Sequence, residues 1–117
     1  MDLVVNLSRF YVCDVDALDN NEIRQITPPG QGPVAVYRIA DAFYATDDVC
    51  SHGQALLSEG EVDEDYVVEC PWHGGTFDVR TGEALSFPCV LPIKVYPVTV
   101  EGGKLYLDLA AGDRKPQ

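Results

Sequence analysis

Three features of the sequence together predict an all-β fold. Turn-forming residues recur about every ten positions, the runs between them are short and rich in Val, Ile, Tyr, Phe and Thr, and segments with helical periodicity are nearly absent. The chain has 117 residues, of which 46% are hydrophobic. This is enough to bury one core, so we expect a single domain over residues 1–117.

The expected strands are short apolar runs bounded by turn signals. The final two flank Gly102-Gly103, whose glycines accept the positive φ angles of a tight hairpin. Asp14 is a suitable cap for one helical turn over residues 14–18. Residues 112–117 carry nothing apolar to anchor them and are expected to fray. The predicted strands cover residues 22–27, 34–39, 43–46, 66–69, 76–79, 83–86, 95–101 and 104–109.

The charge of the chain argues against two classes of partner. A net charge of -11, from 8 basic and 19 acidic residues, repels both nucleic-acid phosphates and anionic lipid headgroups. The longest apolar stretches, such as residues 34–37 and 90–93, are far shorter than the roughly 20 residues that cross a bilayer. Residues 1–6 do not have the basic start of a secretory signal. We therefore expect a cytoplasmic protein that binds neither nucleic acid nor membrane.

The most informative motif is a pair of Cys-His groups. Cys50 and His52 form the first group, Cys70 and His73 form the second, and 17 residues (53–69) lie between Cys50-Ser51-His52 and Cys70. Each group brings a soft thiolate and an imidazole together, which is the donor set of zinc sites and of Rieske [2Fe-2S] centres. A zinc-binding interaction module remains an alternative, although such modules usually pair cysteine with cysteine and histidine with histidine. The matched offsets of the only two histidines favour the Rieske centre over zinc and over ordinary buried side chains.

This motif resembles that of the Rieske ferredoxins of bacterial aromatic-ring dioxygenase systems. The resemblance covers nearly the whole chain, including the turn at residues 77–82, the proline-containing segment 87–89 and the closing hairpin. It implies the Rieske fold of three antiparallel sheets. In that fold the cluster-binding subdomain, here about residues 46–90, is formed by two loops at one tip. By the same resemblance, a third loop that carries Pro88 covers the cluster.

The resemblance also implies the ligand set for one [2Fe-2S] cluster. Cys50 and Cys70 are expected to bind the inner iron, and His52 and His73 the outer iron through Nδ1. Two ferric ions, two sulfides, two thiolates and two neutral imidazoles sum to zero charge, whereas a cluster with four thiolates starts at about -2. Histidine ligation therefore raises the reduction potential.

Differences from the respiratory Rieske proteins bear on two expected properties, a disulfide between the loops and the reduction potential. Those proteins carry an extra cysteine in each cluster loop, and the matching positions here are Ala55 and Trp72, so no disulfide between the loops is expected. They also carry a serine and a tyrosine that donate hydrogen bonds to the cluster sulfurs, where Gly75 and Phe77 stand here. Because two hydrogen-bond donors are missing, we expect a reduction potential near the low end of the roughly -150 to +300 mV Rieske range.

The resemblance implies a monomeric carrier of single electrons, from an NADH-dependent flavoprotein ferredoxin reductase to a terminal ring-hydroxylating oxygenase. No catalytic residues are expected, because both histidines are committed as ligands. Trp72, Gln54 and Pro88 are candidates for partner contact, whereas Cys13 and Cys89 are assigned no chemistry. The alternative is a small Rieske subunit of another reductase, such as nitrite reductase.

Overall fold

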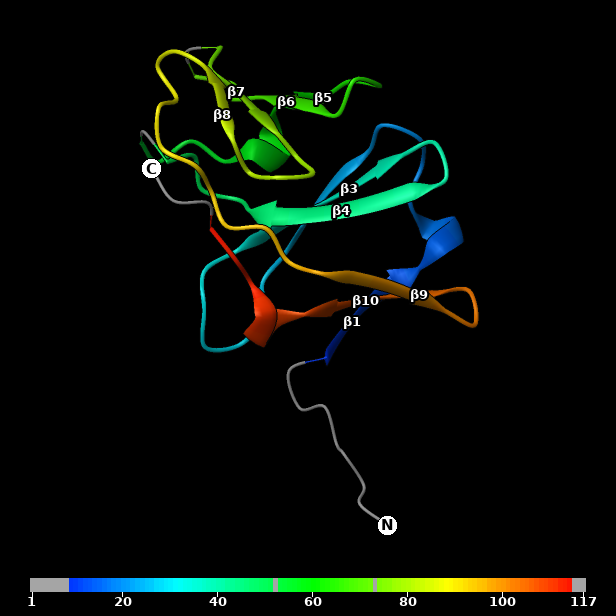
Figure 1. Cartoon of the computed structure of the whole chain (residues 1–117). Helices are drawn as coiled ribbons and strands as arrows, with labels where there is room; N and C mark the ends of the chain where they lie inside the picture. The colour runs from blue at the N-terminus through cyan, green and yellow to red at the C-terminus, as the bar shows by residue number, and fades with distance from the viewer. Residues whose placement is uncertain (1–8, 52, 73, 115–117) are drawn as a thin grey trace.

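Three antiparallel sheets are arranged one after another along the molecule (Figure 1). The computed structural model describes residues 9–51, 53–72 and 74–114. The end sheet has the strand order β1 (Arg9–Asp14), β10 (Lys104–Asp108), β9 (Val98–Glu101). The central sheet has the order β2 (Ile23–Ile26), β3 (Val34–Ile39), β4 (Ala42–Asp47). The loop-bearing sheet has the order β5 (Glu61–Val62), β6 (Val67–Glu69), β7 (Thr76–Asp78), β8 (Ala84–Ser86).

Helical structure within the described residues is limited to three short 3₁₀ turns, η1 (Val15–Ala17), η2 (Leu57–Glu59) and η3 (Leu109–Ala111). The predicted all-β fold with three antiparallel sheets is therefore confirmed. In the part of the chain that the structure describes, no helix is long and apolar enough to cross a membrane. The turn predicted after Asp14 is η1, but Asp14 makes no side-chain cap for it. Its carboxylate instead accepts hydrogen bonds from Tyr11 and Lys104.

Strand β3 is the centre of the packing, because it is buried on both faces. Val34 and Val36 belong to the apolar core shared with the end sheet, together with Leu105 and Leu107 of β10. The alternate residues of β3 belong to a second core, which lies under the loop-bearing sheet. Successive side chains of a strand point to opposite faces, so a continuous apolar run fills both cores. The members of the second core on β3 are Ala35, Tyr37 and Ile39.

The tight turns have the backbone geometry that their residues permit. Gly102 and Gly103 have φ angles of 60° and 75°, and Glu101 pairs with Lys104 across them. Two successive positive φ angles are typical of the turns that match the twist of a hairpin. The hairpin predicted at this position is therefore confirmed.

Two strands were missed by the sequence analysis. Strand β1 pairs with β10, but its register shifts between Tyr11 and Cys13, so the alternation of buried and exposed residues is interrupted. Strand β5 has two residues, which is too short for any periodic pattern. Both strands form because a partner strand already presents free backbone groups at its edge.

For two of the predicted strands, the backbone explains why the observed strand begins later. Tyr66 has a φ angle of 68°, so β6 begins one residue later than predicted. The strand predicted over residues 95–101 begins only at Val98. Val95 instead forms single bridges with Thr46 and Asp113, and Pro97, which has no N–H, separates these bridges from β9.

Of the segment expected to fray, the structure describes residues 112–114, and this part is paired with another segment of the chain. Asp113 and Val95 exchange two backbone hydrogen bonds of 2.8 Å. Gly112 packs so closely on Lys94 and Tyr96 that an added Cβ would lie 2.6 and 2.8 Å from their side chains. Backbone pairing thus anchors a segment without apolar side chains, and residues 115–117 lie outside the described residues.

Asp48 connects the central sheet to the segment that leads to η2. Its carboxylate is fully buried and accepts hydrogen bonds from the Ser58 backbone N–H (2.7 Å), the Ser58 hydroxyl (2.8 Å) and Gln25 Nε2 (2.7 Å). Its backbone carbonyl also accepts from the Leu57 N–H. Since Asp48 precedes Cys50 by two residues, this network holds the start of the first loop.

We expect Asp48→Ala to destabilise the protein by about 2–4 kcal/mol, because buried donors lose their acceptor. For a domain of this size, that corresponds to a decrease of roughly 10 °C in the thermal midpoint. The thermal midpoint is measured by circular dichroism of the cluster-loaded protein. The control is Asp41→Ala, since the Asp41 side chain is fully exposed. Equal midpoints for the two variants would contradict the structural role of Asp48.

Candidate metal centre

The two loops that carry the Cys-His groups close in the same way. Cys50 donates its N–H to the carbonyl of Ala55 (2.9 Å), and Cys70 donates its N–H to the carbonyl of Gly75 (2.7 Å). In both loops the acceptor is therefore the residue five positions later. The carbonyl of each cysteine accepts a further N–H from within its own loop, at 3.2 Å for Cys50 and 3.1 Å for Cys70. Each loop is thus a compact turn that begins at its cysteine.

Both cysteines are buried in the apolar core beneath these loops. Cys50 and Cys70 belong to the second core, where they lie with aliphatic side chains and Phe77. All four cysteines of the chain lie within the described residues, and no disulfide joins any of them. Two sulfurs held at the base of paired loops are suited to binding a soft metal from one side.

A third loop, between β8 and the segment leading to β9, lies against the first. Ser51 donates its hydroxyl to the carbonyl of Leu91 (2.6 Å), and the Cys50 sulfur lies 3.4 Å from the sulfur of Cys89. The second loop also meets it, because an added Cβ on Gly75 would overlap the Cys89 sulfur. The sequence predicted a third loop carrying Pro88 at this place, and the structure brings the three loops together.

The candidate residues for partner contact have different environments. Trp72 is 59% exposed although it stands two residues after the buried Cys70. Gln54 is exposed, and Pro88 is half-buried. Phe87, which directly precedes Pro88 on the third loop, is 83% exposed. His52 and His73 lie outside the described residues.

The donor set fits an iron–sulfur cluster. Two cysteine sulfurs emerge from an apolar core, and each precedes a histidine of the same loop by two or three positions. Cysteine and histidine together are ligands of the Rieske class of cluster. Ala55 is buried and Trp72 is exposed at the positions matched above to the disulfide of the respiratory Rieske proteins. Each loop is closed by backbone hydrogen bonds of its own.

Comparison with known families decides between zinc and iron. The sequence profile of the Rieske [2Fe-2S] domain matches residues 8–97, which is most of the chain. This chain belongs to the Rieske [2Fe-2S] family. Its cofactor is a Rieske-type [2Fe-2S] cluster, so the zinc alternative is wrong.

The relatives within the Rieske family are electron-transfer proteins. Ferredoxin CarAc of Metapseudomonas resinovorans is 47% identical over 104 residues, covering 89% of this chain and 94% of the relative. The ferredoxin component of the p-cumate 2,3-dioxygenase system of Pseudomonas putida is 45% identical over 100 residues, covering 86% of this chain and 85% of the relative. The predicted likeness to Rieske ferredoxins of dioxygenase systems is therefore confirmed.

Solved structures agree with this assignment. A structure described as a complex of reduced oxygenase and oxidized ferredoxin in carbazole 1,9a-dioxygenase contains a chain with 42% sequence identity and a TM-score of 0.85. The match covers 94% of this Rieske chain and 98% of that chain. The Rieske fold predicted from the resemblance is confirmed.

Cys89 and Phe87 are features of the site that sequence reasoning missed. Cys89 was assigned no chemistry, yet its sulfur lies 3.4 Å from the sulfur of Cys50. The available signal was its position directly after Pro88, in the loop expected to cover the cluster. Phe87 precedes the same proline, and a large apolar residue at a loop tip is a signal of an exposed contact.

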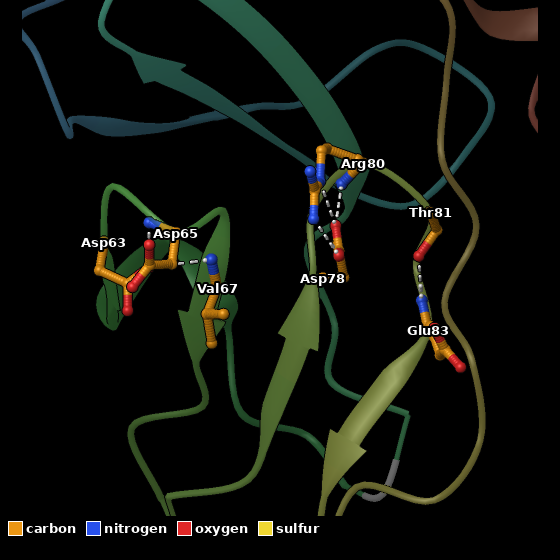
Figure 2. A network of polar contacts seen from close by, with 7 residues as sticks. All are labelled: Asp63, Asp65, Val67, Asp78, Arg80, Thr81 and Glu83. Carbon is orange, nitrogen blue, oxygen red and sulfur yellow. Dashed lines mark hydrogen bonds and ion pairs between the residues drawn. The ribbon is translucent and has the colours of Figure 1, made fainter.

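The loop-bearing sheet is braced by acidic side chains at its turns (Figure 2). Asp63 accepts hydrogen bonds from the backbone N–H groups of Asp65 (2.9 Å) and Val67 (3.1 Å). Asp78 accepts two from the Arg80 guanidinium, at 3.1 and 2.9 Å. The bonds between Asp63 and Asp65 and between Asp78 and Arg80 join an aspartate to the residue two positions later, and such bonds stabilise tight turns.

Arg80 also determines the protonation of Asp78. Burial raises the pKa of the Asp78 carboxyl, but the hydrogen bonds and charge of Arg80 outweigh burial and hold that pKa below its usual value. The Arg80 guanidinium in turn lies 4.3 Å from the centroid of the Tyr66 ring. The ion pair between Arg80 and Asp78 lies within the turn after β7 (Figure 2), and the cation–π contact joins this turn to Tyr66, directly before β6.

We expect Asp78→Asn to lower the thermal midpoint at pH 7 by roughly 4 °C, or about 1 kcal/mol. The folded pKa of Asp78 is lower than the unfolded value of about 3.9, so its contribution is complete above that value and is lost as the pH falls through the folded pKa. The difference between wild type and variant, followed by circular dichroism, should therefore shrink as the pH approaches 3. Asp65→Asn, at an exposed position of the same sheet, is the control. A difference that stays constant down to pH 3 would show that the ionised carboxylate is not responsible.

Proposed function

We propose that this Rieske protein carries single electrons from an NADH-dependent flavoprotein ferredoxin reductase to the terminal oxygenase of an aromatic-ring dioxygenase system. The observation that carries the proposal is the identity of 45 and 47% with ferredoxin components, over most of both chains. A [2Fe-2S] cluster exchanges one electron at a time with its partners when it is bound. The chain itself acts as a component of such a system and not as its catalytic subunit.

The cluster ligands in this proposal are Cys50, His52, Cys70 and His73. The support is the equal closure of both loops at their cysteines and the burial of both sulfurs in one core. Burial keeps water away from the thiolates, and water access and surrounding dielectric control the potential of such centres.

The partner-facing surface is proposed to be the tip where the three loops meet. We define the tip patch as the exposed apolar side chains of these loops. Large exposed apolar side chains are enriched at protein interfaces, and a related ferredoxin of a dioxygenase system has been solved in a complex with its oxygenase. Gln54 and Pro88 lie beside the patch on the same loops. The members of the tip patch are Trp72, Phe87, Val90 and Leu91.

Two further properties belong to this proposal. The protein is proposed to act in the cytoplasm as a monomer, because a reductase and an oxygenase must each reach the same tip in turn. The net charge of -11 supports encounters with partners that present basic surfaces. A permanent reductase subunit of the nitrite reductase type has less support, because the relatives at 45 and 47% identity are ferredoxins.

The purified protein should show the visible absorption of a Rieske cluster and an EPR signal after reduction with dithionite. We expect Cys50→Ala and His73→Ala to lose most of the iron and both signals, because each variant removes one ligand. Cys13→Ala is the matched control, since Cys13 is also a buried cysteine but belongs to the core of the end sheet. Colourless, EPR-silent wild type would refute the proposal, and normal iron content in Cys50→Ala would refute the ligand set.

For the tip patch, we expect Phe87→Ala and Trp72→Ala to reduce the second-order rate of electron transfer to the oxygenase about tenfold each, as interface anchors do. Stopped-flow oxidation of the reduced protein measures this rate. Tyr11→Ala is the control, because Tyr11 is 48% exposed on β1 in the end sheet (Figure 1). A loss as large in the control as in the tip variants would move the docking surface away from the loops.

A further inference from the structure

Cys89 lies beside the proposed ligand Cys50, although it is not part of the ligand set. Its sulfur is 3.4 Å from the Cys50 sulfur, within hydrogen-bonding distance for sulfur, and the residue is only 2% exposed. Cys50 and Cys70 belong to the same core as Cys89. A third sulfur is therefore held at the base of the loops, with no histidine next to it in the sequence.

We propose that the Cys89 thiol donates a hydrogen bond to the Cys50 sulfur and thereby raises the reduction potential of the cluster. Cys89 is thus a positioning residue that acts through a ligand. This inference rests on the proposed assignment of Cys50 as a ligand.

The chemistry determines which sulfur is the donor. An iron-bound cysteine is a thiolate and carries no proton, so it can only accept. A buried cysteine without a metal is a neutral thiol, because an apolar environment disfavours the charged form. The S–H group of Cys89 is a weak donor, but a thiolate is a charged acceptor, and charge-assisted hydrogen bonds are the stronger ones.

The surrounding backbone holds the Cys89 sulfur in place. The Cys89 N–H donates to the carbonyl of Ser86 (3.1 Å), which fixes the start of the third loop. On the other side, Gly75 leaves the space that the sulfur fills. A Cβ at position 75 would overlap the Cys89 sulfur and would lie 3.1 Å from the Cys89 backbone nitrogen. Glycine is required at position 75 for the thiol to reach Cys50.

This arrangement revises the interpretation of Gly75. From the sequence, Gly75 is one of two positions at which a hydrogen-bond donor of the respiratory Rieske proteins is missing. The structure fills the space beside it with a thiol from a different loop, and that thiol points at a ligand sulfur. One donor is therefore replaced by Cys89, and only the donor missing at Phe77 remains without a substitute among these contacts.

The charge of the reduced cluster determines whether this hydrogen bond raises or lowers the reduction potential. Reduction adds one negative charge to the cluster and its thiolates, so a donor on a ligand sulfur stabilises the reduced state more than the oxidised state. Hydrogen bonds to the sulfurs are among the factors that set the potential of these clusters. Removal of the donor should lower the potential.

The test is the midpoint potential of the cluster-loaded protein, measured by voltammetry on wild type and three variants. Cys89→Ala removes the donor and should have a lower potential than wild type. Cys89→Ser keeps a donor and should have a potential at or above that of wild type. Cys13→Ala, a buried cysteine in the other core, should have the wild-type potential.

The resonance Raman spectrum supplies a second readout that packing alone does not change. In D₂O, the iron–thiolate stretching bands should shift more in wild type than in Cys89→Ala, because the S–H proton exchanges. Equal shifts, or an unchanged potential in Cys89→Ala with an intact cluster, would overturn the proposal.

If Cys89→Ala fails to load its cluster, Cys89→Ser decides the question alone, since a potential below that of wild type overturns the proposal. Failure of the ligand assignment would look different. It would appear as wild type without a cluster, or as Cys50→Ala with one.

Discussion

Cys50 and Cys70 present their sulfurs from inside an apolar core, and the rest of the structure supports this placement. Each cysteine donates its N–H to the residue five positions later, so the two loops are built alike although their sequences differ. The core beneath them depends on β3, whose two faces fill two cores at once. A rigid base therefore exists under both loops, which an iron–sulfur site requires, because loosely held ligands would let water reach the thiolates.

Polar side chains fix backbone positions that apolar packing alone does not specify. Asp48 is buried, and its carboxylate accepts three hydrogen bonds, two from Ser58 and one from Gln25. These bonds have direction, so they fix where the first loop leaves the central sheet. In the loop-bearing sheet, Asp78 and Arg80 fix the turn after β7. Both networks place a carboxylate that is at least partly buried, in a chain whose other carboxylates are mostly exposed.

The fold class and the Rieske-type cofactor could be predicted from the sequence because both depend on local signals. Gly102-Gly103 specifies its turn by backbone freedom alone, and two Cys-His groups are recognisable without any structure. The pairing of Val95 with Asp113, the bulged β1 and the contact between Cys50 and Cys89 each join residues far apart in the chain. No spacing rule encodes such contacts, because they depend on how the sheets meet.

The third loop carries an exposed side chain at the tip and, two residues later, a buried side chain in the core. Phe87 is 83% exposed, and two residues later Cys89 is 2% exposed beside the sulfur of the proposed ligand Cys50. In the proposed function, the path of this loop has to satisfy two constraints. It presents exposed side chains to a partner, and it holds the Cys89 thiol beside Cys50. The hydrogen bond from Ser51 to the Leu91 carbonyl ties this loop to the first loop and lets both constraints be met together.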